Sequence, residues 1–212
     1  MRGALLTFEG VEGSGKSTQA GLLADWLASR GLDVVLSREP GGTPVGERIR
    51  DVLLDVDAGE TDGRTELFLY LASRNQLVRE LVLPALRRGA VVVLDRFADS
   101  SAAYQGGGRE LGERVVARLN KLATAAIRPD LTILVDLPVE IGRRRKDGAP
   151  LDRLERERVE FHERVRQAYL RLARRAPKRV RVVDGTRPAS ELQDEVRRLV
   201  AEVLERRGMV ER

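Results

Sequence analysis

The sequence predicts an α/β fold in which a parallel sheet is covered by helices on both faces. Short apolar runs rich in β-branched residues alternate with longer segments of helical periodicity. The runs are almost continuously apolar, which is typical of parallel strands buried on both faces. In sheets of this kind ligands bind beyond the carboxyl ends of the strands, so we expect the functional residues to follow the strands.

The expected elements follow one another without a linker, an internal repeat or a low-complexity segment. Strands are expected at residues 4–8, 33–36, 91–94, 131–135 and 180–183. Helices are expected at residues 16–30, 64–88, 110–127, 140–146 and 154–175, with glycines closing the first two. A last helix is expected to begin at Ser190, with Gln193 completing a capping box. We therefore predict a single domain over residues 1–212.

Composition excludes several classes of protein. The 212 residues include no cysteine, which rules out disulfides and thiolate metal sites and is consistent with a reducing cytoplasm. Nothing resembles a signal peptide, and no apolar run approaches the roughly 20 residues needed to span a bilayer. We therefore expect a soluble, cytoplasmic protein without a membrane partner.

The chain is basic, with a net charge of +5, and only four of its 38 basic residues are lysine. The arginines are mostly interspersed with acidic residues in helical segments, which is typical of solvated helix faces. We therefore expect no nucleic-acid partner. His162, the single histidine, lies in a helical segment away from the motifs below and is expected at the surface.

A phosphate-binding loop follows the first expected strand. Residues 10–17 match the pattern G-x4-G-K-[ST], with a helix expected directly after it. The glycines let backbone N–H groups surround phosphate oxygens, Lys16 reaches the β- and γ-phosphates, and the Ser17 hydroxyl is a Mg²⁺ ligand. The motif predicts binding of a nucleoside triphosphate by Gly10, Val11, Glu12, Gly13, Ser14, Gly15, Lys16, Ser17 and Thr18. By itself it does not separate kinases from GTPases, motor ATPases or structural nucleotide binders.

A carboxylate and a guanidinium follow the third expected strand. Asp95 ends that strand, where a carboxylate on the Mg²⁺ side of a nucleotide site is expected, so Ser17 and Asp95 are the candidate metal residues. Arg96 comes next, and its planar set of donors suits phosphoryl oxygens better than an ammonium group does. These residues place a carboxylate and a phosphate-binding guanidinium at the same edge of the sheet as the phosphate loop.

Five further segments have the order and spacing of one family. Together with residues 8–17, the segments 38–43, 71–74, 95–106, 152–155 and 161–169 closely resemble bacterial thymidylate kinases, over residues 4 to 170. The resemblance implies phosphorylation of thymidine monophosphate (dTMP) to dTDP with ATP and Mg²⁺, in the synthesis of dTTP for DNA replication. It also implies a P-loop kinase fold with a lid segment, and a homodimer.

The resemblance assigns roles on the acceptor side. It places the ring of Tyr70 on the thymine, Arg74 at the base edge or its surroundings, and Tyr104 against the sugar, where it disfavours a ribose 2′-hydroxyl. Gln105 offers a donor and an acceptor to the base. The complete implied dTMP-binding set is Glu39, Arg50, Tyr70, Arg74, Arg96, Ser100, Ser101, Tyr104 and Gln105.

A basic segment at residues 142–153, interrupted by Gly148 and Pro150, is expected to be a lid over ATP. The family places its catalytic arginine either in the phosphate loop or in the lid. This loop has no arginine, so the lid supplies it, and the sequence does not rank the candidates. Glu12 is implied to bind the acceptor's 3′-hydroxyl and to position arginines. The expected catalytic residues are Lys16, Arg96, Glu12, Arg143, Arg145 and Arg153.

Three alternatives remain. A kinase for another nucleoside monophosphate would keep the fold and change the acceptor. A regulatory GTPase is disfavoured, because the guanine-binding pattern Asn-Lys-x-Asp is absent from the sequence. A basic ATPase that binds nucleic acid would show salt-sensitive DNA binding without turnover of monophosphates. The family pattern also departs at Phe97, where tyrosine is common, so one hydrogen bond is in doubt.

Overall fold

The computed structural model contains one five-stranded parallel sheet, and it describes residues 3–57, 59–148 and 150–210. The strand order is β2-β3-β1-β4-β5. Ala149, in the expected lid, and the chain ends at 1–2 and 211–212 lie outside the described residues. The strands are β1 (Ala4–Glu9), β2 (Val34–Arg38), β3 (Val91–Asp95), β4 (Leu131–Asp136) and β5 (Val180–Asp184).

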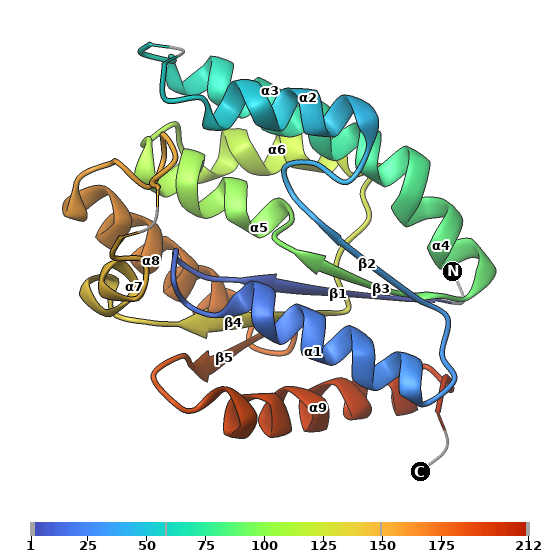
Figure 1. Cartoon of the computed structure of the whole chain (residues 1–212). Helices are drawn as coiled ribbons and strands as arrows, with labels where there is room; N and C mark the ends of the chain where they lie inside the picture. Colours follow the sequence, from blue (N-terminus) through green and yellow to red (C-terminus); the bar gives the residue numbers. More distant parts are fainter. Residues whose placement is uncertain (1–2, 58, 149, 211–212) are drawn as a thin grey trace.

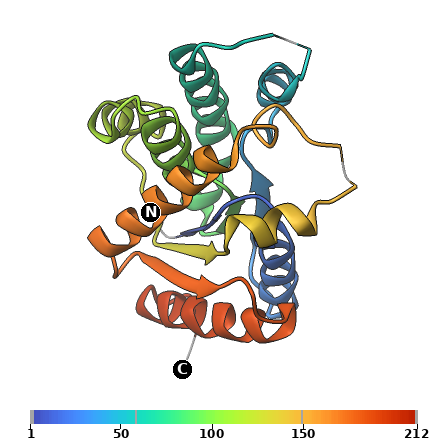
Figure 2. The same cartoon turned by 90° about the vertical axis from the view of Figure 1, so that its left-hand side faces the viewer.

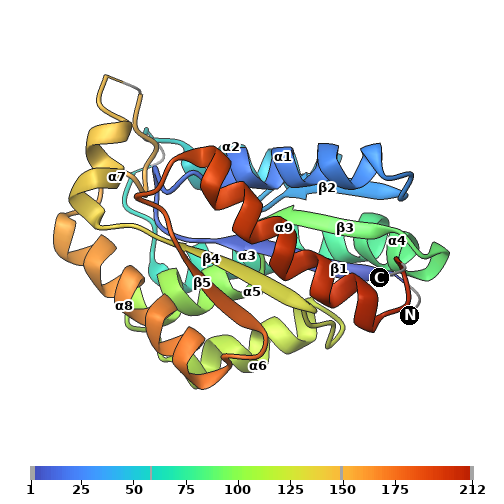
Figure 3. The ribbon, with the colours of Figure 1, turned by 90° about the horizontal axis from the view of Figure 1, so that it is seen from below.

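Helices cover both faces of this sheet (Figure 1). Leu6 and Phe8 of β1 point to a core shared with α1 and α9, whereas Leu5 points to a second core on the other face. In Figure 3 α1 and α9 cross the sheet on the side that faces the viewer. The helical elements are α1 (Lys16–Ser29), α2 (Pro44–Leu54), α3 (Gly63–Leu77), η1 (Val78–Val82), α4 (Leu83–Arg88), α5 (Ala98–Ser101), η2 (Ala102–Gly108), α6 (Glu113–Ala123), α7 (Val139–Arg145), α8 (Val159–Arg175) and α9 (Ala189–Arg206).

The five expected strands and the α/β fold class are confirmed, and the helix ends differ from expectation for local reasons. The segment 64–88 is divided into α3, the π-helical turn η1 and α4. Pro84 lies in the first turn of α4 and cannot donate a backbone hydrogen bond, so the preceding turn widens. The helix expected at 110–127 stops at Ala123, because Ala125 and Ala126 have positive φ angles.

Two other expectations at helix starts were wrong. The helix expected from residue 154 begins at Val159, after a turn. The last helix begins at Ala189 after Pro188, so Ser190 lies inside its first turn and the expected capping box is absent. Sequence analysis also missed α2, although Thr43 caps it by accepting from the Gly46 N–H and Pro44 is its first residue.

The register of the strands brings the functional segments together. Phe8 of β1 and Arg38 of β2 both pair with Asp95 of β3, so all three strands end side by side. The strand arrows of Figure 1 point to this edge, and Figure 2 shows it from the front with α7 and α8 beside it. Among the described residues, no helix has both the length and the apolar character needed to cross a bilayer.

Candidate active site

The phosphate loop joins β1 to α1 and lies against α7. Gly13 has a φ of 70°, and a Cβ there would lie 2.3 Å from the Gly142 carbonyl oxygen. Conversely, a Cβ on Gly142 would lie 2.3 Å from the Glu12 carbonyl oxygen. The loop and the first residue of the expected lid therefore approach through two glycines, a contact that sequence analysis missed. The first turn of α1 has no acidic residue, which leaves its positive end open to an anion.

Lys16 is the first residue of α1 and is 8% exposed. Its Nζ donates to the Val11 carbonyl oxygen at 3.3 Å, within the loop itself. Burial and the nearby Arg96 lower the pKa of Lys16 to about 8, against the opposing effect of Glu12 and other carboxylates. Lys16 thus keeps its positive charge below about pH 8, and an arriving polyphosphate would stabilise that charge further.

The two candidate metal residues are in contact. The Ser17 hydroxyl donates to Oδ2 of Asp95, and Oδ1 of Asp95 is buried without a hydrogen-bond partner among the described residues. A carboxylate oxygen left in this way fits a hard cation, which prefers oxygen ligands. Within the same ranges no group of three or more acidic or histidine side chains could hold a metal alone. A metal ion here would need phosphate oxygens as further ligands.

Arg96 forms the centre of the site. Its backbone has a φ of 71°, in the left-handed region, and its N–H is held by the Phe8 carbonyl oxygen at 2.9 Å. Nη2 donates to Glu12 at 2.8 Å and to the Tyr104 hydroxyl at 3.1 Å. Nη1 donates to the Gly10 carbonyl oxygen at 3.2 Å and to the Ser100 hydroxyl at 3.3 Å. The guanidinium therefore links the phosphate loop to the segment that follows β3.

Glu12 is held in its ionised form. Burial opposes ionisation, but Arg96, His162, Lys16 and Tyr104 together lower the pKa of Glu12 well below its ordinary value. Burial also raises the pKa of Tyr104 well above its ordinary value, so the hydroxyl stays protonated and donates to Glu12 at 2.6 Å. The negative charge of Glu12 inside the phosphate loop is thus kept, and the positive charges and hydrogen-bond donors around it compensate it.

The expectation that His162 lies at the surface was wrong. His162 is 4% exposed, and its Nδ1 lies 3.5 Å from Oε2 of Glu12. The helix α8 brings it there, because Phe161 and Val165 of the same helix pack into the core beneath η2. The sequence shows the helix but does not show which groups meet across it.

One cavity of about 540 Å³ contains most of the expected site residues. Phosphate-loop residues and acceptor-side residues line it together. Gly10, Val11 and Ser14 do not line it, although they belong to the loop, and neither do Arg74, Arg143 and Arg153. The expected residues that line it are Glu12, Gly13, Gly15, Lys16, Ser17, Thr18, Glu39, Arg50, Tyr70, Asp95, Arg96, Ser100, Ser101, Tyr104, Gln105 and Arg145.

Gln105 and Glu39 offer polar atoms to this cavity. Gln105 donates from Nε2 to Glu66 at 2.9 Å, which fixes which way its amide faces. Glu39 accepts from Arg74 with Oε2, while Oε1 is buried without a partner among the described residues. Burial raises the pKa of Glu39 even though Arg74 acts in the opposite direction. Arg50 donates to the Pro40 carbonyl oxygen at 2.9 Å from the wall of the same cavity.

Arg74 lies beneath the cavity and does not reach its wall. It is 1% exposed, with Nε donating to Glu39 at 2.8 Å and Nη1 donating to Ser101 at 2.8 Å and to Asn120 at 2.6 Å. Nη2 donates to the Phe97 carbonyl oxygen at 3.0 Å. The guanidinium nitrogens are therefore engaged by protein groups. The structure thus places Arg74 against Glu39 and Ser101 of the cavity wall, and its role at the base edge or its surroundings stays a prediction.

The three candidate lid arginines occupy different places. Arg145 lines the main cavity and donates to the Gly13 and Gly185 carbonyl oxygens at 3.3 and 2.9 Å. Arg143 lines a separate cavity beside it. Arg153 is held by the Leu53 carbonyl oxygen and by Glu66. Residues 142–145 form the last turn of α7, so the expected lid starts inside a helix.

Sequence analysis missed several supporting residues. Glu66 is fully buried and accepts from Gln105, Arg109 and Arg153, which joins α3 to η2 and to the segment before α8. Glu9 accepts from Ser100 and from the Tyr169 hydroxyl, and burial with the nearby Asp99 raises its pKa to about 7. Glu9 lies within the segment 8–17 that carries the resemblance, although no role was assigned to it, whereas Glu66 carries no local signal.

Comparisons with known proteins agree with this geometry. The family model described as thymidylate kinase matches residues 8–196. A thymidylate kinase of Pelobacter propionicus is 46% identical over 212 residues, covering 97% of this chain and 95% of that protein. One of Symbiobacterium thermophilum is 47% identical over 202 residues, covering 95% and 94%. A thymidylate kinase crystal structure from Ehrlichia chaffeensis superposes with a TM-score of 0.77 at 31% identity, covering 93% of this chain and 98% of that one. The chain belongs to the thymidylate kinase family.

Proposed function

We propose that this protein transfers the γ-phosphoryl group of ATP to dTMP, giving ADP and dTDP, in the synthesis of dTTP for DNA replication. The observation that carries this proposal is the shared cavity, because Lys16 of the phosphate loop and Tyr70 and Gln105 of the acceptor side line one space. Arg96 and Glu12 line the same space and bind each other at 2.8 Å. Two nucleotides bound there would meet at these groups.

The chemistry needs positioning and positive charge more than a strong base. An oxygen of the dTMP phosphate attacks the γ-phosphorus, the bond to the β–γ bridging oxygen breaks, and its electron pair leaves with ADP. The attacking oxygen is already anionic near neutral pH. Lys16 and Arg96 stabilise the charge that develops on the transferred group. The phosphate loop and Arg50 hold the two phosphate chains in place.

Mg²⁺ is the cofactor that this site would take. Ser17 and Asp95 would hold it, and the unpartnered Oδ1 of Asp95 supports that assignment. The ion would supply positive charge to the phosphate oxygens of ATP. Asp95 lies at the end of β3 beside Arg96, so the metal residues and the phosphate-binding arginine come from one strand end.

We also propose that the single domain carries its lid at residues 142–153 and that Arg145 is the catalytic lid arginine. Support comes from its place on the wall of the main cavity, in contrast to Arg143 and Arg153. The Gly13–Gly142 contact gives the segment a fixed point from which to close. The kcat values of the variants Arg143→Ala, Arg145→Ala and Arg153→Ala would rank the three arginines. A larger loss of kcat for Arg153→Ala than for Arg145→Ala would overturn this choice.

Turnover with different acceptors tests the proposed function directly. In an assay that couples ADP release to NADH oxidation, we expect dTMP to be used in preference to dCMP and AMP, because Gln105 is oriented by Glu66 for one base edge. The base of dUMP has the same edge, so the comparison with dUMP measures the contribution of the 5-methyl group. When dTDP formation is followed directly by chromatography, without coupling enzymes that need Mg²⁺ themselves, EDTA should abolish the rate and excess Mg²⁺ should restore it. The Lys16→Ala variant gives the background rate of ADP release in the coupled assay. Equal rates with all four monophosphates would favour a kinase of a different acceptor specificity and reject the assignment of the base.

A homodimer is the expected assembly, and exposed apolar side chains support it. Val52 of α2, Phe68 of α3, and Val115 and Leu122 of α6 are exposed, and these three helices lie together on one side of the molecule (Figure 1). Burial of such side chains against a second copy would remove apolar area from water. We expect sedimentation velocity at micromolar concentration to show a dimer and the Phe68→Glu variant to sediment as a monomer.

The substrates are cytoplasmic metabolites, so we propose the cytoplasm as the location of this protein, which cell fractionation can test.

A further inference from the structure

Glu12 lies between two cavities, and its two carboxylate oxygens have different surroundings. The main cavity lies on one side of it, and a second cavity of about 390 Å³ lies between the phosphate loop, α7 and α8. Oε1 accepts from Arg96 at 2.8 Å and from Tyr104 at 2.6 Å. Oε2 is buried and has no hydrogen-bond partner among the described residues. Within the described part of the chain, hydrogen bonds therefore hold Oε1 of Glu12 in place, whereas none holds Oε2.

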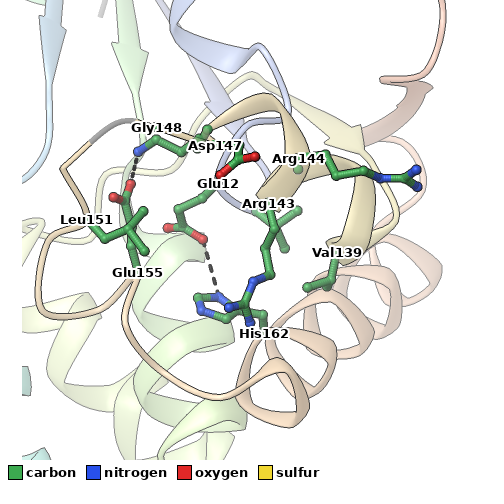
Figure 4. A pocket seen from close by; sticks show the side chains of 12 residues that line it. Glu12, Val139, Arg143, Arg144, Asp147, Gly148, Leu151, Glu155 and His162 are labelled. Atoms are coloured by element: carbon green, nitrogen blue, oxygen red, sulfur yellow. Dashed lines mark hydrogen bonds and ion pairs between the residues drawn. The ribbon is translucent and has the colours of Figure 1, made fainter.

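Among the contacts of the described residues, His162 is the donor that lies nearest to Oε2 of Glu12. Figure 4 shows its ring directed at Glu12 across the second cavity, with Nδ1 3.5 Å from Oε2. The edge of the neighbouring Phe161 ring supports the imidazole, with centroids 5.4 Å apart at 86°. A separation of 3.5 Å exceeds an ordinary hydrogen bond, but the open space beside both groups lets the ring and the carboxylate move together. Hydrogen bonds in active sites often shorten when a ligand binds.

The other charged groups around Glu12 do not replace this contact. Arg96 and Tyr104 bind the opposite oxygen, and Lys16 donates to the Val11 carbonyl. On the far wall of the second cavity Lys146 is paired with Glu155. Arg143 lines the same cavity, with no contact to Glu12 found within the described residues. The imidazole is thus the group placed to complete the hydrogen bonding of the carboxylate.

We propose that His162 is a positioning residue, which donates Nδ1–H to Oε2 of Glu12 and so fixes the carboxylate that faces the acceptor nucleotide. This inference rests on the proposed function, because it assigns Glu12 to the dTMP side of the site. With Oε2 held, the carboxylate cannot rotate, and Oε1 stays in place for Arg96, Tyr104 and the acceptor. His162 does not line the main cavity, so in this proposal it acts through Glu12 and not by contact with a substrate. Its effect should therefore be on dTMP binding and not on ATP binding.

Two kinds of variant test the donor. His162→Leu removes it at a similar volume, and His162→Phe removes it but keeps a planar ring, in case the first variant fails to fold. His162→Gln keeps an N–H donor. We expect the donor-free variants to bind dTMP about five- to tenfold more weakly by isothermal titration calorimetry, because a hydrogen bond to a charged group is lost. ATP binding should stay within about twofold, and His162→Gln should recover most of the dTMP affinity.

A double-mutant cycle shows whether His162 acts through Glu12. In the Glu12→Gln background, His162→Leu should change the Kd for dTMP by less than about twofold, because the charged partner is already gone. Val165→Ala is the matched control: it weakens the core under the same helix and should lower the Tm without changing either Kd. Equal losses in both backgrounds, equal losses for Leu and Gln, or no loss in any variant would overturn the inference. Wild-type protein that does not bind dTMP would instead reject the proposed function.

Discussion

Replacing Arg96 with lysine is expected to lower kcat for dTMP phosphorylation roughly a thousandfold. The guanidinium reaches Glu12 and Tyr104 with one terminal nitrogen and Gly10 and Ser100 with the other. A lysine keeps the charge but has one nitrogen, which cannot satisfy acceptors on both sides and still meet a phosphoryl oxygen. The loss should therefore come from lost geometry and not from lost charge.

Steady-state kinetics with both substrates measures this effect, and thermal unfolding shows whether the fold is intact. Arg88→Lys is the matched control, because Arg88 is an exposed arginine whose partner, Asp33, lies outside the cavity. We expect that variant to behave as wild type. A folded Arg96→Lys protein that loses less than about tenfold in kcat would remove Arg96 from the centre of the mechanism.

Replacing Arg74 with methionine is expected to lower the free energy of unfolding by about 3–5 kcal/mol, the usual cost of breaking a buried ion pair. Nη2 of Arg74 lies 2.6 Å from Oε2 of Glu39, and both side chains are almost fully buried. Without the guanidinium, Glu39 loses its counter-charge, and Ser101, Asn120 and the Phe97 carbonyl lose their donor. Methionine fills most of the space, so the loss reports mainly on charge and hydrogen bonding.

Urea unfolding of the wild type, Arg74→Met and the double variant Arg74→Met, Glu39→Gln distinguishes the causes. The double variant should regain part of the stability, because it no longer buries an unpaired carboxylate. A single variant that keeps the stability of the wild type would contradict the structural role of this ion pair. A rise in the KM for dTMP in addition to the loss of stability would show that Arg74 also contributes to binding of the base.

The phosphate loop and the sheet could be predicted because their signals are local. Gly10–Ser17 form a contiguous motif, and each apolar run such as Val91–Asp95 makes one strand. Asp95 and Arg96 could be placed at the site because a parallel sheet brings strand ends to one edge. Glu39, Arg50 and Gln105 came from resemblance, and they lie on the cavity wall.

Contacts between distant segments depended on the tertiary structure. Tyr70 and Arg74 are one helical turn apart, yet Tyr70 lines the cavity while Arg74 is buried among Glu39, Ser101 and Asn120. Helical spacing gives a shared direction, but the neighbours that α5 and α6 supply decide how deep each side chain lies. His162 differs from expectation for the same reason, because α8 packs its buried face toward the phosphate loop.

By itself, the sequence determined that this chain has a phosphate loop at the end of a parallel strand, with a carboxylate and an arginine after a second strand. These are properties of neighbouring residues and of sheet geometry. Only the tertiary structure decided which guanidinium groups reach the cavity, since Arg145 lines it while Arg153 is held by Glu66. Ion-pair choice among many arginines is settled by burial and distance, and neither quantity is encoded in the spacing of one segment.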